Sequence, residues 1–313
     1  MSEAATSERH DAPERGDTSK RRVAVIGAGR MGGAMATRLA AAGYPVNIYN
    51  RTAERAARLA RETGGSAAPT ARQAVEGVDT VIVSLADDAA CREAYAGPDG
   101  LAAGLSESAV VVETSTIAPG TVRSLVPLVS ERGAKLLDAP VSGSVPLVQR
   151  GELTFMIGGP AEAIERVRPV LDELSARVFH LGEHGTGAVM KLAVNAVVHG
   201  LNQALAESLV LAEKAGVDRA AAYAVFAASA IAAPFVQYKK AAYLEPETTP
   251  TAFMLDLVAK DLDLIDALAT EVGVRMEQVK TNRRVVQEAL KAGYSGRDMS
   301  ALAVHLRSTP ASD

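Results

Sequence analysis

The chain has 313 residues, of which 48% are hydrophobic and 22% are charged, and its formal net charge is -4. This length is sufficient for two domains, each with a core of its own. The acidic balance argues against nucleic acid as the main partner, because phosphate binding needs a surplus of Lys and Arg. Cys91 is the single cysteine, which excludes an intrachain disulfide and fits a cytoplasmic location.

Residues 1–20 are polar and charged and contain no apolar stretch typical of a secretory signal. Their low hydrophobicity predicts a disordered tail. No uninterrupted apolar run approaches the roughly 18 residues of a membrane span, so we expect no contact with a membrane. His, Cys and carboxylate residues show no ligand spacing, so we also expect no metal site.

The first folded stretch combines a strand, a glycine-rich turn and a helix. Val23–Ile26 are apolar, as in a buried strand, and Gly27, Gly29 and Gly32 follow with the spacing G-x-G-x-x-G. Gly27 lets the chain turn sharply, Gly29 lets a pyrophosphate approach the main chain, and Gly32 lets the helix pack closely. Free N–H groups at the helix start then bind phosphates, which favours a dinucleotide site over a purely structural turn.

The next strand, 46–49, ends in a sequence that indicates which dinucleotide binds. NAD sites place a carboxylate here for the adenosine ribose, whereas this chain has Asn50, Arg51 and Thr52. A cation and a hydroxyl donor suit a 2′-phosphate, so we predict NADPH in preference to NADH. In the alternative interpretation, Asn50 and Thr52 only cap the helix at 53–63 and Arg51 is a solvated charge.

Strands and helices then alternate, which predicts a mostly parallel sheet with helices on both faces. Ligands of such sheets bind beyond the carboxyl ends of the strands, so the residues that follow each strand are candidates for the site. The predicted strands are 80–85, 109–113, 134–138, 153–157 and 178–181, with helices that include 119–131 and 161–175.

Strand signals stop at Gly185. The segment 186–214 is apolar and contains no Pro, which predicts a long connecting helix. We therefore predict a Rossmann-type, NADP-binding domain over 21–184 and an all-helical domain for substrate binding and dimerisation over 185–313. The further helices expected there are 218–229, 234–243, 252–272, 275–292 and 298–306.

Several motifs occur together in this chain: GAGRMGGAM at 27–35, DAPVSGS at 138–144, GTGAVMKLAVN at 185–195, AKDLDL at 259–264 and GRDMSA at 296–301. From about residue 22 to 308 the chain resembles the β-hydroxyacid dehydrogenase family. That family includes 3-hydroxyisobutyrate dehydrogenases, tartronate semialdehyde reductases and glyoxylate or succinic semialdehyde reductases. The resemblance implies hydride transfer between a nicotinamide and a small hydroxy acid, in a homodimer or homotetramer.

Lys191 matches the catalytic lysine of the family. An ammonium group can stabilise and protonate a developing alkoxide, and the neutral amine can remove the hydroxyl proton in the reverse direction. Apolar neighbours favour a lowered pKa. Asn195 lies four residues later on the same helix face, and the resemblance implies that it holds Lys191 and the substrate oxygen. His199 continues this face, and we interpret it as an interior polar group because the family does not require it.

Ser142 and Gly143 match the family's loop for the substrate carboxylate, although Ser144 stands where the family usually has glycine. Thr116 matches a residue near nicotinamide and substrate, with a helix cap before Pro119 as the alternative.

Lys260 matches a lysine that reaches the cofactor from the helical domain. Asp261 is expected near the substrate cleft, with a surface ion pair as the alternative interpretation. Ala86 replaces the family's proline after Leu85, and backbone contacts with the cofactor should survive this change. The expected cofactor contacts are Gly27, Gly29, Arg30, Met31, Gly32, Asn50, Arg51, Thr52, Leu85, Ala86, Thr116 and Lys260.

The sequence thus predicts an NADP-dependent oxidoreductase that interconverts a small hydroxy acid and the matching oxo acid or semialdehyde. One alternative is an imine or ketone reductase on the same scaffold, which Lys191 disfavours because imine reductases of this scaffold generally replace it. The other is a catalytically silent NADP-binding module, although silent relatives typically lose the lysine.

Overall fold

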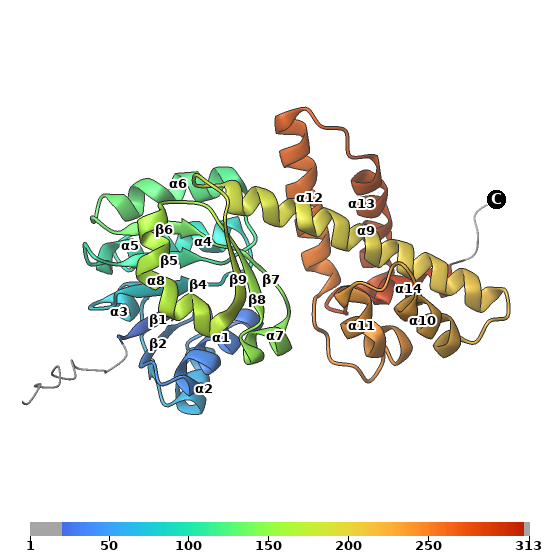
Figure 1. The fold of residues 1–313 in the computed structure, drawn as a ribbon, viewed down its shortest axis with the longest axis horizontal. Helices are drawn as coiled ribbons and strands as arrows, with labels where there is room; N and C mark the ends of the chain where they lie inside the picture. Colours follow the sequence, from blue (N-terminus) through green and yellow to red (C-terminus); the bar gives the residue numbers. More distant parts are fainter. Residues whose placement is uncertain (1–20, 310–313) are drawn as a thin grey trace, which may run out of the picture.

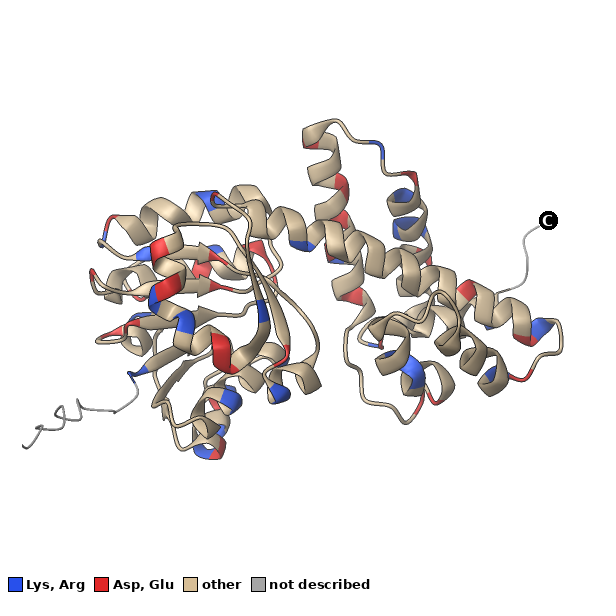
Figure 2. Ribbon diagram, viewed as in Figure 1, with Lys and Arg blue, Asp and Glu red and all other residues tan. Residues whose placement is uncertain are grey.

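A computed structural model of the chain describes residues 21–309, and the expected tail at 1–20 lies outside them. Figure 1 shows an α/β half and an all-helical half, joined by the long helix α9 (Thr186–Lys214). Acidic and basic residues are mixed along both halves (Figure 2). Within residues 21–309, every helix is too short or too polar to span a membrane.

Six parallel strands form the main sheet, in the order β3-β2-β1-β4-β5-β6. Val23 of β1 lies opposite Val46 of β2 and Thr80 of β4, which sets the register of the centre. The strands are almost continuously apolar because helices cover both faces of the sheet. They are β1 (Val23–Ile26), β2 (Val46–Tyr49), β3 (Ser66–Ala67), β4 (Thr80–Val83), β5 (Val110–Glu113) and β6 (Lys135–Asp138).

Alternate residues of the strands pack into two separate cores, one on each face of the sheet. Val25 packs with α1, α2 and α8, whereas Ile26 packs with α3, α4 and α6. This division follows from the two-residue period of a strand. The helices of this half are α1 (Arg30–Ala41), α2 (Ala53–Thr63), α3 (Ala71–Val75), α4 (Asp88–Tyr95), α5 (Leu101–Gly104), α6 (Pro119–Ser130), α7 (Val145–Arg150) and α8 (Ala161–Leu174).

Strands form where 153–157 and 178–181 were predicted, but they do not belong to the main parallel sheet. They are β8 (Leu153–Ile157) and β9 (Ser175–His180), and with β7 (Val141–Ser142) they form a second, three-stranded sheet. β7 and β8 are antiparallel, and β8 and β9 are parallel. The connection between β7 and β8 holds only the six-residue α7, which is short for a parallel crossover, so the chain reverses instead.

The chain after the connecting helix is all-helical, as the sequence predicts, and it packs around the C-terminal part of α9. Its core contains Leu205, Leu209, Tyr223, Val258 and Leu262. The remaining helices are α10 (Arg219–Ala228), α11 (Pro234–Leu244), α12 (Leu255–Val272), α13 (Glu277–Ala289) and α14 (Ala301–Ser308), with a π-helical turn at Leu290–Tyr294.

The first turn of α9 is attached to the sheet by Asp138, the last residue of β6. Its Oδ2 accepts hydrogen bonds from the backbone N–H groups of Gly185 (2.9 Å) and Ala188 (3.0 Å). A Cβ at Gly187 would lie 2.5 Å from the carbonyl oxygens of Asp138 and Met156, so the helix start packs directly on both sheets. Asp138 therefore fixes where the following residues of α9 lie.

We predict that Asp138→Ala lowers the free energy of unfolding by about 2–4 kcal/mol, because two buried N–H groups lose their acceptor. Asp138→Asn keeps one acceptor oxygen, so its loss should stay below about 1 kcal/mol. Urea denaturation followed by circular dichroism measures both. Equal losses in the two variants would contradict this role of Asp138.

The same carboxylate predicts a pH dependence. Burial raises the pKa of Asp138 from 3.8 to about 6, so the folded chain binds this proton more tightly than the unfolded chain. The contribution of Asp138 to stability therefore falls as the pH rises from about 4 to about 6. Asp138→Asn should lack that part of the slope.

Candidate active site

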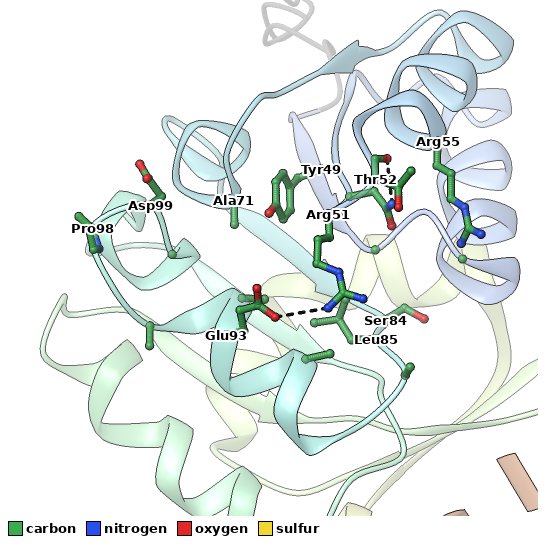
Figure 3. Close-up of a pocket in the computed structure, with 18 residues that line it drawn as sticks. Tyr49, Arg51, Thr52, Arg55, Ala71, Ser84, Leu85, Glu93, Pro98 and Asp99 are labelled. Atoms are coloured by element: carbon green, nitrogen blue, oxygen red, sulfur yellow. Dashed lines mark hydrogen bonds and ion pairs between the residues drawn. The ribbon is translucent and has the colours of Figure 1, made fainter. Parts of the chain in front are cut away.

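A cavity of about 430 Å³ opens at the carboxyl ends of β1, β2 and β4. Figure 3 shows side chains from both walls that point into it. It lies where ligands of parallel sheets bind. The predicted cofactor residues that line it are Gly27, Gly29, Asn50, Arg51, Thr52, Leu85 and Ala86, and Tyr49, Arg55, Ser84 and Glu93 are among the further lining residues.

The glycine turn beside this cavity is sterically constrained. Gly27 has φ of +106°, and a Cβ at Gly32 would lie 2.0 Å from the carbonyl oxygen of Gly27. At Gly29 a Cβ would meet nothing within 4 Å, so the main chain faces open space there. Arg30 and Met31 are the first residues of α1, and no side chain caps that end of the helix. The turn thus has the room and the free donors that a pyrophosphate needs.

Asn50 connects the glycine turn to the loop after β2. Its Oδ1 accepts from the backbone N–H of Ala28 (3.0 Å), and its Nδ2 donates to the carbonyl of Thr52 (3.0 Å). Thr52 occupies the N-cap position of α2, but neither its side chain nor that of Asn50 makes a capping hydrogen bond to the helix.

Arg51 lies at the mouth of the cavity. Its guanidinium is 3.5 Å from the carboxylate of Glu93 on α4, as Figure 3 shows. Arg55, four residues after Arg51 and in the first turn of α2, lines the same cavity. Sequence reasoning missed Arg55 and Glu93. The four-residue spacing from Arg51 is a signal for Arg55, whereas Glu93 has no comparable local signal.

A buried network positions the loops that follow β4 and β5. Ser115 Oγ accepts from the backbone N–H of Leu85 (2.8 Å), and the N–H of Ser115 donates to Glu113 (2.8 Å). The Tyr95 hydroxyl donates to the other Glu113 oxygen (2.9 Å). Burial raises the pKa of Glu113 to about 7. Ser115 is among the residues that follow a predicted strand and were therefore candidates for the site. Glu113 was not predicted, although a carboxylate that ends an apolar strand is a readable signal.

A second cluster joins the two halves of the molecule. Asn195 Nδ2 donates to Asp261 Oδ2 (2.7 Å), and Asp261 Oδ1 lies 2.9 Å from Lys260 Nζ. Lys260 Nζ also donates to the carbonyl of Thr116 (2.6 Å), in the loop between β5 and α6. Four predicted site residues, from three segments distant in sequence, therefore meet at one place.

The structure excludes two alternative interpretations from the sequence analysis, a surface ion pair for Asp261 and a helix cap for Thr116. Asp261 is 1% exposed, so it does not form a surface pair with Lys260. Ala118, not Thr116, occupies the N-cap position of α6, and its N–H donates to Asp88 (3.0 Å). Thr116 is therefore not the helix cap.

Lys191 lies on α9 one turn before Asn195 and is partly buried. Burial lowers its pKa, and the nearby charge of Lys260 lowers it further, whereas Asp261 opposes both and raises it. The net shift is downward, toward the range in which an amine can exchange a proton with a substrate at moderate pH.

Ser142 and Gly143 make no direct hydrogen bond to the residues of this cluster within the described part of the chain. Ser142 pairs with Thr154 in the second sheet, and Gly143 has φ of +145°. Across residues 21–309, no hydrogen bond or ion pair connects either residue to Lys191 or Asn195. In the same part of the chain, no three His, Cys, Asp or Glu side chains are grouped as metal ligands would be.

Comparison with known proteins agrees with this geometry. A model described as the NAD binding domain of 6-phosphogluconate dehydrogenase matches residues 22–182, and one described as NAD-binding of NADP-dependent 3-hydroxyisobutyrate dehydrogenase matches 185–306. The NAD-dependent L-serine dehydrogenase of Pseudomonas aeruginosa is 33% identical over 288 residues, which is 90% of this chain and 96% of that protein. The chain belongs to the β-hydroxyacid dehydrogenase family.

Further members of this family are also similar. The 3-hydroxyisobutyrate dehydrogenase of Pseudomonas aeruginosa is 39% identical over 198 residues, which is 63% of this chain and 66% of that protein. The structure of 3-hydroxyisobutyrate dehydrogenase from Salmonella typhimurium superimposes with a TM-score of 0.83 at 26% identity, over 91% of this chain and 100% of that one. As a β-hydroxyacid dehydrogenase, this chain is an NAD(P)-binding oxidoreductase.

We predict that Gly32→Ala reduces NADPH affinity at least tenfold, because its Cβ would lie 2.0 Å from the Gly27 carbonyl oxygen and displace the phosphate-binding turn. Gly33→Ala is the matched control, since the nearest atom to its Cβ would be 3.8 Å away. Fluorescence titration with NADPH measures both affinities, and circular dichroism shows that each variant is folded. Equal affinities in the two variants would contradict the prediction.

Proposed function

We propose that the chain is an NADP-dependent oxidoreductase that interconverts a small hydroxy acid and the matching oxo acid or semialdehyde. Residues 21–184 bind the cofactor, and residues 185–313 complete the substrate site. The observation that supports this most directly is the cluster that joins Asn195, Asp261, Lys260 and Thr116 beside Lys191. The lowered pKa of the Lys191 amine, which the charges of Asp261 and Lys260 influence, supports its role in proton transfer.

Bound NADPH supplies the hydride that reduces the carbonyl carbon. The Lys191 ammonium donates a proton to the carbonyl oxygen as its negative charge develops. In the oxidation direction, the neutral Lys191 amine removes the hydroxyl proton. Asn195 holds the substrate oxygen near Lys191 and is itself oriented by Asp261. Ser142 and the backbone at Gly143 bind the substrate carboxylate.

The names of two relatives narrow the substrate class. L-serine and 3-hydroxyisobutyrate are both short carboxylates with a hydroxyl on carbon 3. We therefore propose a small 3-hydroxy acid as the substrate of this chain. We also propose a homodimer or homotetramer, for which the apolar side chains of Val197 and Leu211, 72% and 71% exposed on α9, supply a surface for a second copy.

The preference for NADPH over NADH rests on the end of β2. No carboxylate stands there to accept bonds from the adenosine ribose, and Arg51 and Arg55 line the cavity. One matching family model is described as NADP-dependent, whereas the L-serine dehydrogenase relative is NAD-dependent. The proposed preference for NADPH therefore rests on the side chains of Arg51 and Arg55.

Lys191→Met should lower the rate of hydroxy acid oxidation by about 10²–10⁴-fold, as loss of a general base does. NADP affinity should change less than about twofold, since the phosphates bind at α1. Lys214→Met, at the exposed end of the same helix, is the control. The assay follows NADPH formation with a panel of small 3-hydroxy acids. If Lys191→Met keeps the wild-type rate, Lys191 is not the base.

The pH profile tests the same assignment. Oxidation needs the neutral amine, and the pKa of Lys191 is lowered, so the rate should rise with pH and level off below the pH at which an ordinary lysine titrates. Reduction needs the ammonium form and should fall over the same interval.

For the cofactor, Arg51→Gln should lower kcat/KM for NADPH by about 10–100-fold, which corresponds to loss of a hydrogen bond to a charged group. NADH should change less than about twofold. Arg58→Gln is the control, because Arg58 lies on α2, which follows the loop of Arg51, and pairs with Glu62. Steady-state kinetics with both cofactors measures the ratio. A proportionate loss with NADPH and NADH would contradict a phosphate contact.

A further inference from the structure

His199 lies on the catalytic face of α9 but has no part in the mechanism above. Lys191, Asn195 and His199 are spaced four residues apart, so they share one face of the helix. His199 is 3% exposed, and its ring lies 6.0 Å from that of Phe253. It is therefore an interior residue, two turns along the helix from Lys191.

The polar neighbour of His199 is the carboxylate that orients the catalytic cluster. His199 Nε2 lies 3.4 Å from Asp261 Oδ2, the same oxygen that accepts from Asn195 Nδ2. Asp261 Oδ1 faces Lys260. The carboxylate is thus held between groups of α9 and the lysine beside it on α12. An anionic oxygen requires a donor, so the geometry assigns the proton to Nε2 of the imidazole.

Packing alone does not account for a histidine at this position. Within residues 21–309, His199 Nδ1 is buried without a hydrogen-bond partner. A buried and unpaired polar atom costs free energy that an apolar side chain of similar size would avoid. The contact to Asp261 is the one polar interaction that the described residues offer this ring in return.

We propose that His199 is a positioning residue for the hydroxy acid reaction, which donates its Nε2–H to Asp261 and so fixes the carboxylate that orients Asn195 and Lys260. This inference rests on the proposed function of the site. His199 acts through Asp261 and does not touch the substrate.

The charges around Lys191 give the proposal a measurable consequence. The charged groups that act on Lys191 are Asp261 and Lys260, both on α12. The groups that act on Asp261 are Lys260 and His199. Loss of the His199 donor leaves more negative charge on Asp261, which holds the proton on Lys191 more tightly. The acid limb of the oxidation profile should then move to higher pH.

Two variants test this role. His199→Leu removes the donor, and we expect kcat for oxidation to fall roughly tenfold, KM for NADP to change less than about twofold, and the acid limb to move to higher pH. His199→Gln keeps an N–H donor but removes the imidazole ring. It should recover most of kcat and return the acid limb to the wild-type position. Thermal unfolding of both variants is measured in parallel.

A purely structural role predicts a different pattern, in which both variants lose stability and activity together while the pH profile stays unchanged. That result would overturn the proposal, as would a His199→Leu variant with wild-type kinetics.

A second measurement does not depend on activity. The ¹⁵N chemical shifts of the ring show which nitrogen carries the proton, and loss of a signal in His199→Gln identifies His199 among the five histidines. The proposal predicts the Nε2–H tautomer, and an Nδ1–H tautomer would overturn it. If the wild type oxidised no hydroxy acid with NADP, the proposed function would fail while the tautomer could still be read.

Discussion

The site depends on one buried negative charge, the carboxylate of Asp261. A buried carboxylate is costly unless it is paired and hydrogen-bonded. Here burial opposes ionisation, but the hydrogen bond from His199 and the charge of Lys260 outweigh it and hold the pKa of Asp261 below its ordinary value. Lys260 in turn donates to the carbonyl of Thr116 in the α/β half. The same ion pair that makes the buried charge tolerable therefore also connects the two halves of the molecule, at the place where we propose the reaction occurs.

The long helix α9 is anchored to the sheet at its first turn and carries Lys191 and Asn195 to this cluster. Its first turn is bound by Asp138 at the end of β6, and its second and third turns carry Lys191 and Asn195. A regular helix has a fixed rise and rotation per residue, so the position of the first turn determines where both side chains lie. Sites carried on rigid elements keep their geometry better than sites carried on loops. In the proposed mechanism the proton-transfer residue Lys191 and its neighbour Asn195 are both carried on this helix.

Periodicity in the sequence was enough to predict the elements, including α2 and α9, whose bounds match those of the structure. It predicted β8 within the second sheet but not the separate sheet itself, because β7 has two residues and no period, and its pairing with β8 crosses a short helix. In the site, too, features set by local spacing were predicted, whereas contacts between residues distant in sequence were not. The glycine turn and the stripe from Lys191 to Asn195 follow from local spacing. The contact of Lys260 with Thr116 joins residues 144 positions apart, and the ion pair of Arg51 with Glu93 joins opposite walls of a cavity.

The central claim is that Lys191 meets the reacting hydroxyl where the helical half contacts the α/β half. A crystal structure with NADP⁺ and a small 3-hydroxy acid such as L-serine tests it most directly. The account predicts that Lys191 Nζ lies about 2.6–3.2 Å from the substrate hydroxyl oxygen, with the substrate carboxylate at Ser142 and Gly143. A complex in which the hydroxyl binds beyond the reach of Lys191, while both ligands are fully bound, would contradict it.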